Sequence, residues 1–542
     1  MKKTFSNMLP VLVVVFGLVT IHAQTNKKLT NAEFKQWHHA DLTTDSIPGI
    51  STEKAYSFLK NKKNSQVIIG VIDSGIDLKH EDLKNKIWVN PNEIVNNNID
   101  DDKNGFIDDI NGWNFAGDLT FQNFEHERIL MNQSLAENKS IISKAQKTYK
   151  SRLKRAKKNI KVVQNRLVNL EKSHDAFSSH LGKPDYTLKE VLAIETTNAN
   201  LNKEIETVRK HIEIIEKISQ KYARHEPINI DIPYHIVNRI KSNRRELEID
   251  SILISGNSIT TDLRATLGDN LTDIKDTQYG SNSLNNNIDN EEHATHVAGI
   301  IAATRNNEKG INGITDNCLI LPVRLNGAGG DEHDKDVALS IRYAVDNGAK
   351  IINASIGKEF SPYKELVYES ILYAAKNDVL IVIAAGNENI NLDKNFQYPN
   401  DSKNLKTEFS NNVIVVGATN SYYGENLVSI FSNYGKLNVD IFAPGHSIYA
   451  TIPNNDYDFK DGTSMAAPMV AGVAGLIRSY YPSLTATQVK EIILNSGTKI
   501  NMQVNAPGSY NKKVDFSDLC SSSSILNAHN AVIMADQMTN NK

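Results

Sequence analysis

The feature that most constrains the fold of this 542-residue chain is a series of short, continuously apolar runs separated by stretches with helical periodicity. The apolar runs lie at 66–73, 319–325, 351–357, 379–389, 413–419 and 439–444, and helices are expected at about 338–347 and 363–377. Runs that are apolar on both sides are typical of buried parallel strands, and the helices between them provide the crossover connections. The sequence therefore predicts an α/β fold with a doubly wound parallel sheet.

The composition is that of an ordinary globular protein. The formal net charge is −3, 40% of the residues are hydrophobic, and no basic patch indicates nucleic-acid binding. Cys318 and Cys520 are the only cysteines, and they show no spacing signature. A disulfide and two buried thiols are both compatible with this pattern.

The N-terminus has the pattern of a processing signal. Two lysines precede an apolar run, and a cleavage site follows after Ala23. This predicts a signal peptide over 1–23 and an exported protein, secreted or periplasmic, with no membrane span in its mature form. An uncleaved N-terminal anchor is the alternative.

A long segment between the first two apolar runs differs in composition and is rich in lysine, glutamate, glutamine and asparagine. Its apolar residues recur in steps of three and four over 142–170 and over 201–218, which predicts two amphipathic helices folded into an antiparallel, coiled-coil-like hairpin. The expected organisation is a signal peptide (1–23), a short N-terminal extension (24–53), a main domain (54–124 and 251–537), a helical insertion (125–250) and a tail (538–542).

Three polar residues stand where such a fold gathers functional groups. Asp73 ends the first apolar run, while His293 and Ser464 each open a helical segment. Carboxyl ends of parallel strands form functional edges, and helix N-termini favour developing negative charge. Ser464 is expected to cap its helix, with Pro468 in the first turn. Each motif alone is compatible with a turn, a core histidine or a cap, but together they form a candidate acyl-transfer triad.

Four segments together resemble the signature segments of the subtilase, or subtilisin-like serine peptidase, family: VIDSGID (71–77), HATHVAGI (293–300), AAGNEN (384–389) and GTSMAAPMVAG (462–472). The resemblance implies a serine endopeptidase that acts on proteins or peptides with Asp73, His293 and Ser464 as its triad. The first histidine of its motif, not His296, would be the general base. Asn387 would stabilise the oxyanion beside the backbone N–H of Ser464.

The same resemblance implies the substrate-binding positions, which are Ser355, Ile356, Gly357, Ala384, Ala385, Gly386 and Gly327. The loop at Gly327 would pair with the substrate as an extended strand, and the other positions would line the primary specificity pocket. A run of acidic residues at 331–336 follows this loop. It would attract basic side chains upstream of the cut, unless it is ordinary solvated surface.

Two features depart from the family pattern. Ala294 replaces the glycine that usually follows the catalytic histidine, which is tolerated in a helix but strained at positive φ. The stretch before the first strand is shorter than the usual inhibitory propeptide. A second interpretation therefore stays open, in which a catalytically idle scaffold binds a partner through its helical insertion. In a third, the insertion recruits one client to an active protease.

A loop rich in asparagine and aspartate follows the first strand. Asp100, Asp102, Asn104 and Asp108, with Gly105 among them, approach the spacing of a calcium-binding loop. The loop lacks the terminal glutamate and the entering helix of an EF-hand. We expect a structural calcium ion here, with a solvated turn as the alternative.

Overall fold

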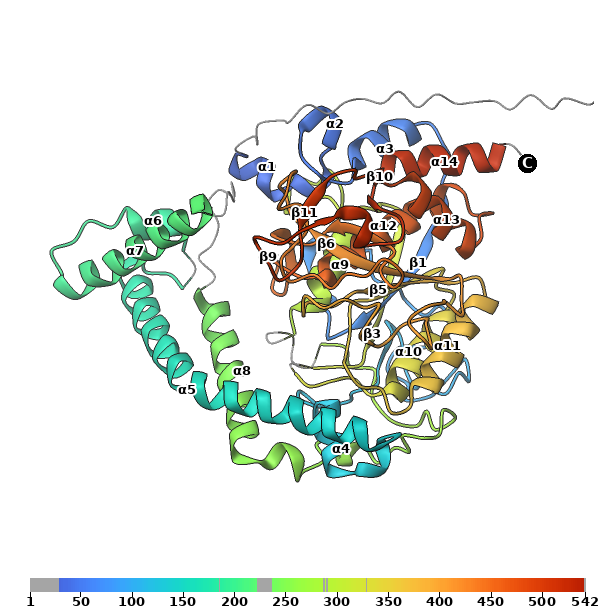
Figure 1. Ribbon diagram of the computed structural model, residues 1–542, viewed down its shortest axis with the longest axis horizontal. Helices are drawn as coiled ribbons and strands as arrows, with labels where there is room; N and C mark the ends of the chain where they lie inside the picture. Colours follow the sequence, from blue (N-terminus) through green and yellow to red (C-terminus); the bar gives the residue numbers. More distant parts are fainter. Residues whose placement is uncertain are drawn as a thin grey trace, which may run out of the picture.

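A nine-stranded sheet forms the centre of the computed structural model (Figure 1), in the order β10-β13-β7-β6-β5-β4-β1-β3-β2. Its neighbouring strands pair in parallel except for β10 and β13. The strands are β1 (Val67–Asp73), β2 (Trp113–Asn114), β3 (Cys318–Arg324), β4 (Ile351–Ala354), β5 (Leu380–Ala384), β6 (Val413–Thr419), β7 (Ile441–Pro444), β10 (Thr498–Lys499) and β13 (Ser524–Ile525). The predicted α/β class is confirmed.

The structure describes residues 29–184, 186–221, 236–285, 288, 291–327 and 329–540. The expected signal peptide and the last two residues of the expected tail lie outside these ranges. Residues 538–540, also assigned to the tail, form the end of α14 (Ala528–Asn540). Among the described helices, none combines the length and hydropathy that a bilayer span requires.

Helices cover both faces of the sheet. One face is covered by α9 (His293–Ala302) and α12 (Thr463–Tyr480), and α13 (Ala486–Ser496) and α14 lie beside α12 (Figure 1). The other face is covered by α10 (Asp334–Asp346) and α11 (Lys364–Lys376). Each face has its own buried apolar cluster. Because α12 consists mainly of small residues, it is buried on nearly every side and packs closely against the strands.

The residues before β1 are part of the main domain, although a separate extension was expected up to residue 53. They form α1 (Asn31–Lys35), α2 (Leu42–Asp45) and α3 (Thr52–Leu59). Trp37 is 1% exposed, and its indole N–H donates to the Ser447 carbonyl at 3.1 Å. Ser51 does not cap α3 with its side chain, because its hydroxyl donates to Asp41 at 2.8 Å.

The insertion contains more helices than the predicted hairpin. They are α4 (Glu125–Met131), α5 (Lys139–Leu181), α6 (Leu188–Leu192), α7 (Ala199–Lys221) and α8 (Ile236–Ser255). The partner that runs along α5 is α8, while α6 and α7 pack at the far end (Figure 1). The prediction paired 142–170 with 201–218, and this pairing is wrong. The sequence of α8 is so polar that its few apolar residues show no clear helical periodicity. The expected boundary at residue 250 also falls within α8.

Both cysteines are free and buried, so the disulfide alternative is wrong. Cys318 begins β3, and its thiol contacts the Thr315 carbonyl at 3.4 Å. Burial raises the pKa of the Cys318 thiol to about 12 and that of the Cys520 thiol to about 11. The thiols behave as small apolar side chains of the core.

Candidate active site

The carboxyl ends of the central strands bring the predicted triad to one edge of the sheet. β1 ends at Asp73, and the N-termini of α9 and α12 place His293 and Ser464 at the same edge. These residues lie together because β1 pairs in parallel with β3 on one side and β4 on the other, so the carboxyl ends of these strands meet at the same edge of the sheet.

Asp73 and His293 are in direct contact. His293 Nδ1 lies 2.7 Å from Asp73 Oδ1, which also accepts the Ser74 backbone N–H at 2.7 Å. Since a carboxylate only accepts, Nδ1 is the donor and Nε2 is left as the acceptor that a general base needs. The Asp73 side chain is 3% exposed and that of His293 is 39% exposed. A buried carboxylate next to a half-exposed imidazole stabilises the protonated ring during catalysis.

His296, the second histidine of the motif, belongs to the core. It is fully buried, and its Nε2 lies 3.0 Å from the Ile448 carbonyl and 3.1 Å from the Asp458 carbonyl. Burial holds its pKa well below the usual value. Ala294 is the second residue of α9, has no positive φ, and donates its N–H to Ser74 Oγ at 3.3 Å. Alanine is therefore tolerated there.

Ser464 lies one residue inside its helix and is not the cap that was expected. α12 begins at Thr463 after Gly462, and Pro468 is its sixth residue rather than part of the first turn. The missing N–H of Pro468 leaves the Ser464 carbonyl without its usual helical donor. The Ser355 hydroxyl donates to that carbonyl at 2.9 Å, and the Ser464 hydroxyl donates to the Ser355 carbonyl at 3.3 Å. These two hydrogen bonds connect Ser464 to the segment that follows β4.

Asn387 is oriented by Thr463. Its Oδ1 accepts the Thr463 backbone N–H at 2.9 Å and the Thr463 hydroxyl at 3.1 Å. The same hydroxyl accepts the Gly386 N–H at 3.0 Å. Because Oδ1 is held in this way, Nδ2 is turned toward the start of α12. A Cβ added to Gly462 would lie 3.5 Å from both Asn387 Nδ2 and the Ser464 backbone nitrogen. The two donors thus flank one small space, as an oxyanion site requires.

A buried ion pair fixes the segments on either side of the Asp73–His293 contact. Glu291 and Arg324 make two contacts of 2.7 Å, and both side chains are at most 1% exposed. Glu291 also accepts the Gly75 N–H at 2.8 Å, and Arg324 donates to Asn114 at 2.8 Å. Burial of this pair is compensated by a full set of hydrogen bonds. It ties the chain after Asp73 to the chain before His293.

The substrate-binding positions divide between two hollows. A cleft of about 370 Å³ beside His293 is lined by Gly327, Ser355, Ile356 and Gly357. Ala384 and Ala385 instead line a smaller hollow of about 20 Å³ together with Gln397, and Gly386 holds the Asn387 turn at φ +102°. The Gln397 amide lies 2.9 Å from the position of a Cβ on Gly357, so the two hollows adjoin there. Sequence patterns did not indicate Gln397.

The acidic run at 331–336 is not solvated surface. Asp334 and Asp336 are at most 2% exposed, and Asp334 bridges Lys358 at 2.8 Å. Glu332 is 3% exposed, and burial raises its pKa to about 7. The Asp334 and Asp336 side chains serve internal contacts, whereas Glu332 lines the cleft beside His293.

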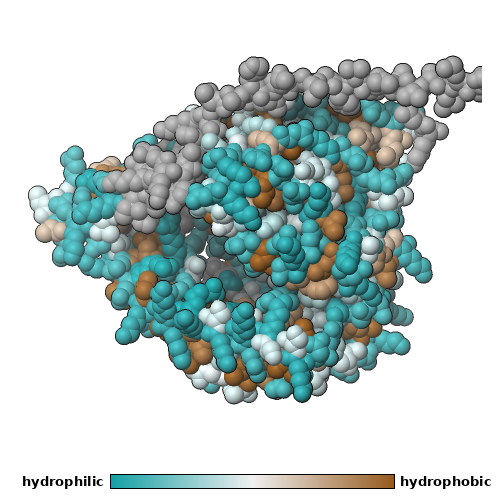
Figure 2. Space-filling model, viewed as in Figure 1, coloured by the Kyte–Doolittle hydropathy of each residue, from teal (hydrophilic) through white to brown (hydrophobic). Residues whose placement is uncertain are grey.

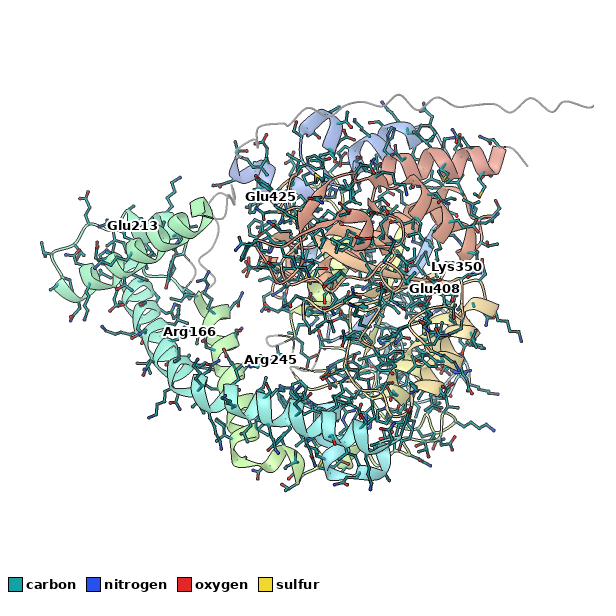
Figure 3. The ribbon with its side chains drawn as sticks, viewed as in Figure 1. Arg166, Glu213, Arg245, Lys350, Glu408 and Glu425 are labelled. Carbon is teal, nitrogen blue, oxygen red and sulfur yellow. The ribbon has the colours of Figure 1, made fainter. Side chains whose placement is uncertain are left out.

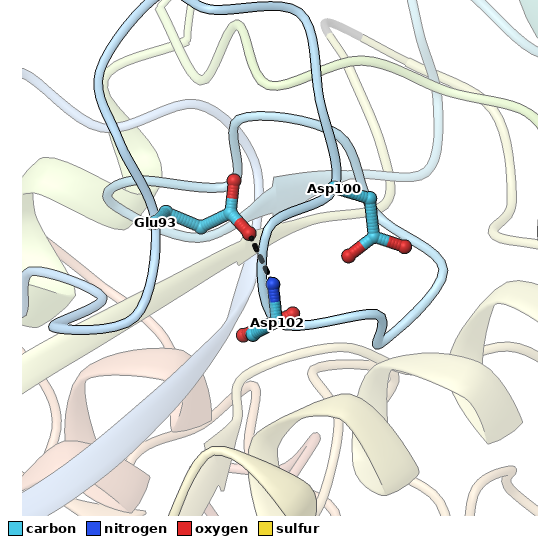
Figure 4. Close-up of side chains that lie close together, drawn as sticks. All are labelled: Glu93, Asp100 and Asp102. Carbon is cyan, nitrogen blue, oxygen red and sulfur yellow. Dashed lines mark hydrogen bonds between the residues drawn. The ribbon is translucent and has the colours of Figure 1, made fainter.

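The predicted calcium loop brings Asp100 and Asp102 close together, with Asn104 beside them. Carboxylate oxygens of Asp100 and Asp102 lie within 4.8 Å of one another and of Glu93, which sequence spacing did not indicate (Figure 4). The Asn104 amide donates to Asp102 at 3.2 Å, next to this cluster, whereas Asp108 accepts two backbone N–H groups of the loop. Three clustered carboxylates are oxygen donors of the kind that calcium prefers.

Comparison with known proteins agrees with this geometry. A model of the subtilase family matches residues 64–514. The chain is similar to the Cell wall-associated protease of Bacillus subtilis (strain 168), with 34% identity over 51% of this chain and 28% of that protein. It is also similar to the Thermophilic serine proteinase of Bacillus sp. (strain AK1), with 40% identity over 38% of this chain and 46% of that protein. The chain thus spans less than half of these two relatives.

Thermitase of Thermoactinomyces vulgaris is 38% identical over 39% of this chain and 68% of that protein. The solved structure of Prenylagaramide maturation protease PagA is 28% identical, covers 45% of this chain and 82% of that chain, and gives a TM-score of 0.37. Since the family model spans most of the chain and four signature segments converge on one sheet edge, the chain belongs to the subtilase family.

Proposed function

We propose that this chain is a serine endopeptidase that hydrolyses peptide bonds through Asp73, His293 and Ser464. The observation that carries the proposal is the 2.7 Å contact between His293 Nδ1 and Asp73 Oδ1. It leaves Nε2 of the imidazole as the free base beside the serine helix.

In the proposed reaction, the Ser464 hydroxyl leaves the Ser355 carbonyl and turns to His293 Nε2, which takes its proton. Ser464 Oγ then attacks the peptide carbonyl, and the resulting oxyanion accepts hydrogen bonds from the Ser464 N–H and Asn387 Nδ2. The intermediate collapses to an acyl-enzyme as His293 protonates the leaving amine. A water molecule, activated by the same imidazole, releases the acid product.

Fluorophosphonate labelling followed by mass spectrometry tests the proposal. We expect one adduct, on Ser464, and neither an adduct nor peptide hydrolysis in folded Ser464→Ala. Ser479→Ala is the matched control, because Ser479 lies on the same helix and donates only to the Leu476 carbonyl at 2.9 Å. Folded wild-type protein without an adduct would refute the peptidase and favour the idle scaffold.

We also propose that the loop of Glu93, Asp100 and Asp102 binds a structural calcium ion. The clustering of their carboxylates within 4.8 Å supports this, since a cation offsets the repulsion among them. Isothermal titration with calcium should give one site in the wild type and none in Asp100→Asn. Identical titrations of the two proteins would rule out this loop.

Export and client binding are further proposals. The lysines and apolar run before Ala23 support export through a cleaved signal. N-terminal sequencing of the exported protein should begin at Gln24. The polar far end of the insertion is the part that we propose recruits a client. Removal of α6 and α7 should then slow cleavage of that client while small peptides are cleaved normally.

A further inference from the structure

The helix α5 of the insertion carries a row of lysines on one side. Between Glu137 and Glu171 the chain has eleven lysines and arginines and no acidic residue. Six exposed lysines within α5 are spaced mainly three or four residues apart, so they line up along one side of the helix. At a rise of 1.5 Å per residue, this row is about 21 Å long. Its members, which we call the lysine stripe, are Lys147, Lys150, Lys154, Lys157, Lys158 and Lys161.

The lysine stripe faces away from the packed side of α5. Ala145, Ala156 and Val163 are the buried residues of this part of the helix. Four of the six lysines lie two positions from one of these residues, which is about 200° around an α-helix. α8 packs along α5, and its Arg245 lines the cleft of about 370 Å³ beside His293 (Figure 3). The stripe is on the solvent side instead, and Figure 2 shows a mostly hydrophilic surface over the insertion.

The stripe lysines have no partners of their own. Within the part of the chain that the structure describes, none of the six side chains makes a hydrogen bond, an ion pair or a cation–π contact. Other cations of the insertion are paired: Lys172 bridges Glu204 at 2.7 Å, and Arg244 bridges Glu171 at 2.6 Å. The charge of the stripe is therefore available to a partner outside the chain.

Tertiary packing holds these repelling charges on a fixed backbone. Like charges three or four residues apart destabilise a helix. The start of α5 is nevertheless anchored to the main domain, because Phe360 packs with Ile129 and Ala145, and Lys144 bridges Glu359 at 3.1 Å. A partner with many negative charges relieves the repulsion and releases the counterions that such a row attracts.

The chemistry of the stripe narrows the class of partner. The apolar side chains within 147–161 are buried or partly buried, so the stripe presents charge without apolar or aromatic groups. A protein interface has an apolar core, a helix that lies in a bilayer inserts large apolar side chains, and single-stranded nucleic acid stacks on aromatic rings. The stripe provides none of these. Lysine ammonium groups are compact point charges that need no fixed two-point geometry, which suits the charged groups of a flexible polymer.

We propose that the lysine stripe binds an anionic polysaccharide outside the cell and so holds the protein at that polymer. This inference rests on the proposed export, which would bring the stripe into contact with polymers of the cell exterior, and it is independent of the peptidase. It also corrects the expectation that the chain has no basic patch. The formal net charge of −3 includes acids elsewhere in the chain, and it conceals a basic row on one helix.

The test measures binding of the full-length mature protein to polygalacturonate, a polymer of carboxylate-bearing sugars, with neutral dextran as the uncharged control. The wild type should bind polygalacturonate alone and lose about tenfold or more in affinity between 50 and 200 mM salt. A stripe variant should bind about tenfold more weakly or worse; it combines Lys150→Gln, Lys154→Gln, Lys157→Gln and Lys161→Gln. A matched control removes the same charge from exposed lysines of the main domain and should stay within about threefold of the wild type; it combines Lys60→Gln, Lys84→Gln, Lys376→Gln and Lys406→Gln.

A wild type that does not bind polygalacturonate, or that binds it no more tightly than the stripe variant, would overturn the inference. Tighter binding to phosphatidylglycerol vesicles or to a single-stranded oligonucleotide at the same salt would also overturn it, and would assign the stripe to a membrane or to nucleic acid. Fluorophosphonate labelling of Ser464 should be the same in every variant, which checks that each is folded. A wild type that binds the polymer without being labelled would refute the peptidase and leave this inference intact.

Discussion

Replacing Gly462 by alanine tests the assignment of the oxyanion site. Gly462 has φ +150° and ψ 158°, and a Cβ there would lie 3.5 Å from both Asn387 Nδ2 and the Ser464 nitrogen. An oxyanion must approach these two donors to about 2.7–3.1 Å, so a methyl group in the same space keeps it out. Loss of one such donor lowers kcat by about 100- to 1000-fold, and the methyl obstructs two. We therefore expect a loss of at least this size.

The substitution also strains the backbone, by about 1–3 kcal/mol for a residue in a region that only glycine favours. Gly268→Ala is the matched control for this strain, because Gly268 has φ +68° and no atom lies within 4 Å of an added Cβ. The assay is kcat on a chromogenic peptide per mole of folded protein, with unfolding in urea to measure stability. Folded Gly462→Ala with kcat within threefold of the wild type would refute the oxyanion assignment. A similar loss in Gly268→Ala would attribute the effect to strain.

Three further predictions follow from buried and clustered polar groups. Burial lowers the pKa of His126 to about 3 and that of His38 well below its usual value. As pH decreases, these two imidazoles are therefore protonated in the unfolded chain before they are protonated in the folded protein. The contribution of these histidines to stability should be complete above about pH 6.5 and be lost, by on the order of a few kcal/mol, as pH decreases toward 3. A His126→Asn variant whose urea midpoint changes between pH 8 and pH 5 as much as that of the wild type would contradict this for His126. A chelator should lower the melting temperature of the wild type but not that of Glu93→Gln, if calcium binds there; equal shifts would exclude that site. Thr463→Val removes the hydroxyl that helps to orient the Asn387 side chain, and it should lower kcat about tenfold with little change in KM. An unchanged kcat would mean that the Thr463 backbone N–H alone orients Asn387.

Local patterns were sufficient to predict the sheet and the candidate triad. The strands are apolar on both faces, so their runs stand out from the rest of the sequence; Asp73 ends such a strand, and His293 begins the helix α9. Ser464 was placed correctly on its helix but misassigned as the cap, because helix limits depend on the backbone turn at Gly462. Pro468 was misplaced for the same reason.

Residues whose role depends on distant partners were not predictable. Glu93 joins Asp100 and Asp102 through a loop whose path no periodicity describes. The helix α8 was missed because its polar sequence, with Asn243 on its buried side, gains its packing from α5. Arg245 becomes part of the cleft only through that packing, so sequence spacing contains no signal for it.

The anchoring of the insertion draws on one residue of the acidic run. Asp334 and Glu125 converge on the same buried Lys358, which lies directly after Gly357. An ammonium this deeply buried requires such partners, and removal of either acid leaves an uncompensated charge. Asp334, one of the acids that sequence analysis offered for substrate attraction, is therefore committed to holding the insertion. By holding the insertion, this buried cluster keeps α8 beside the cleft that His293 lines.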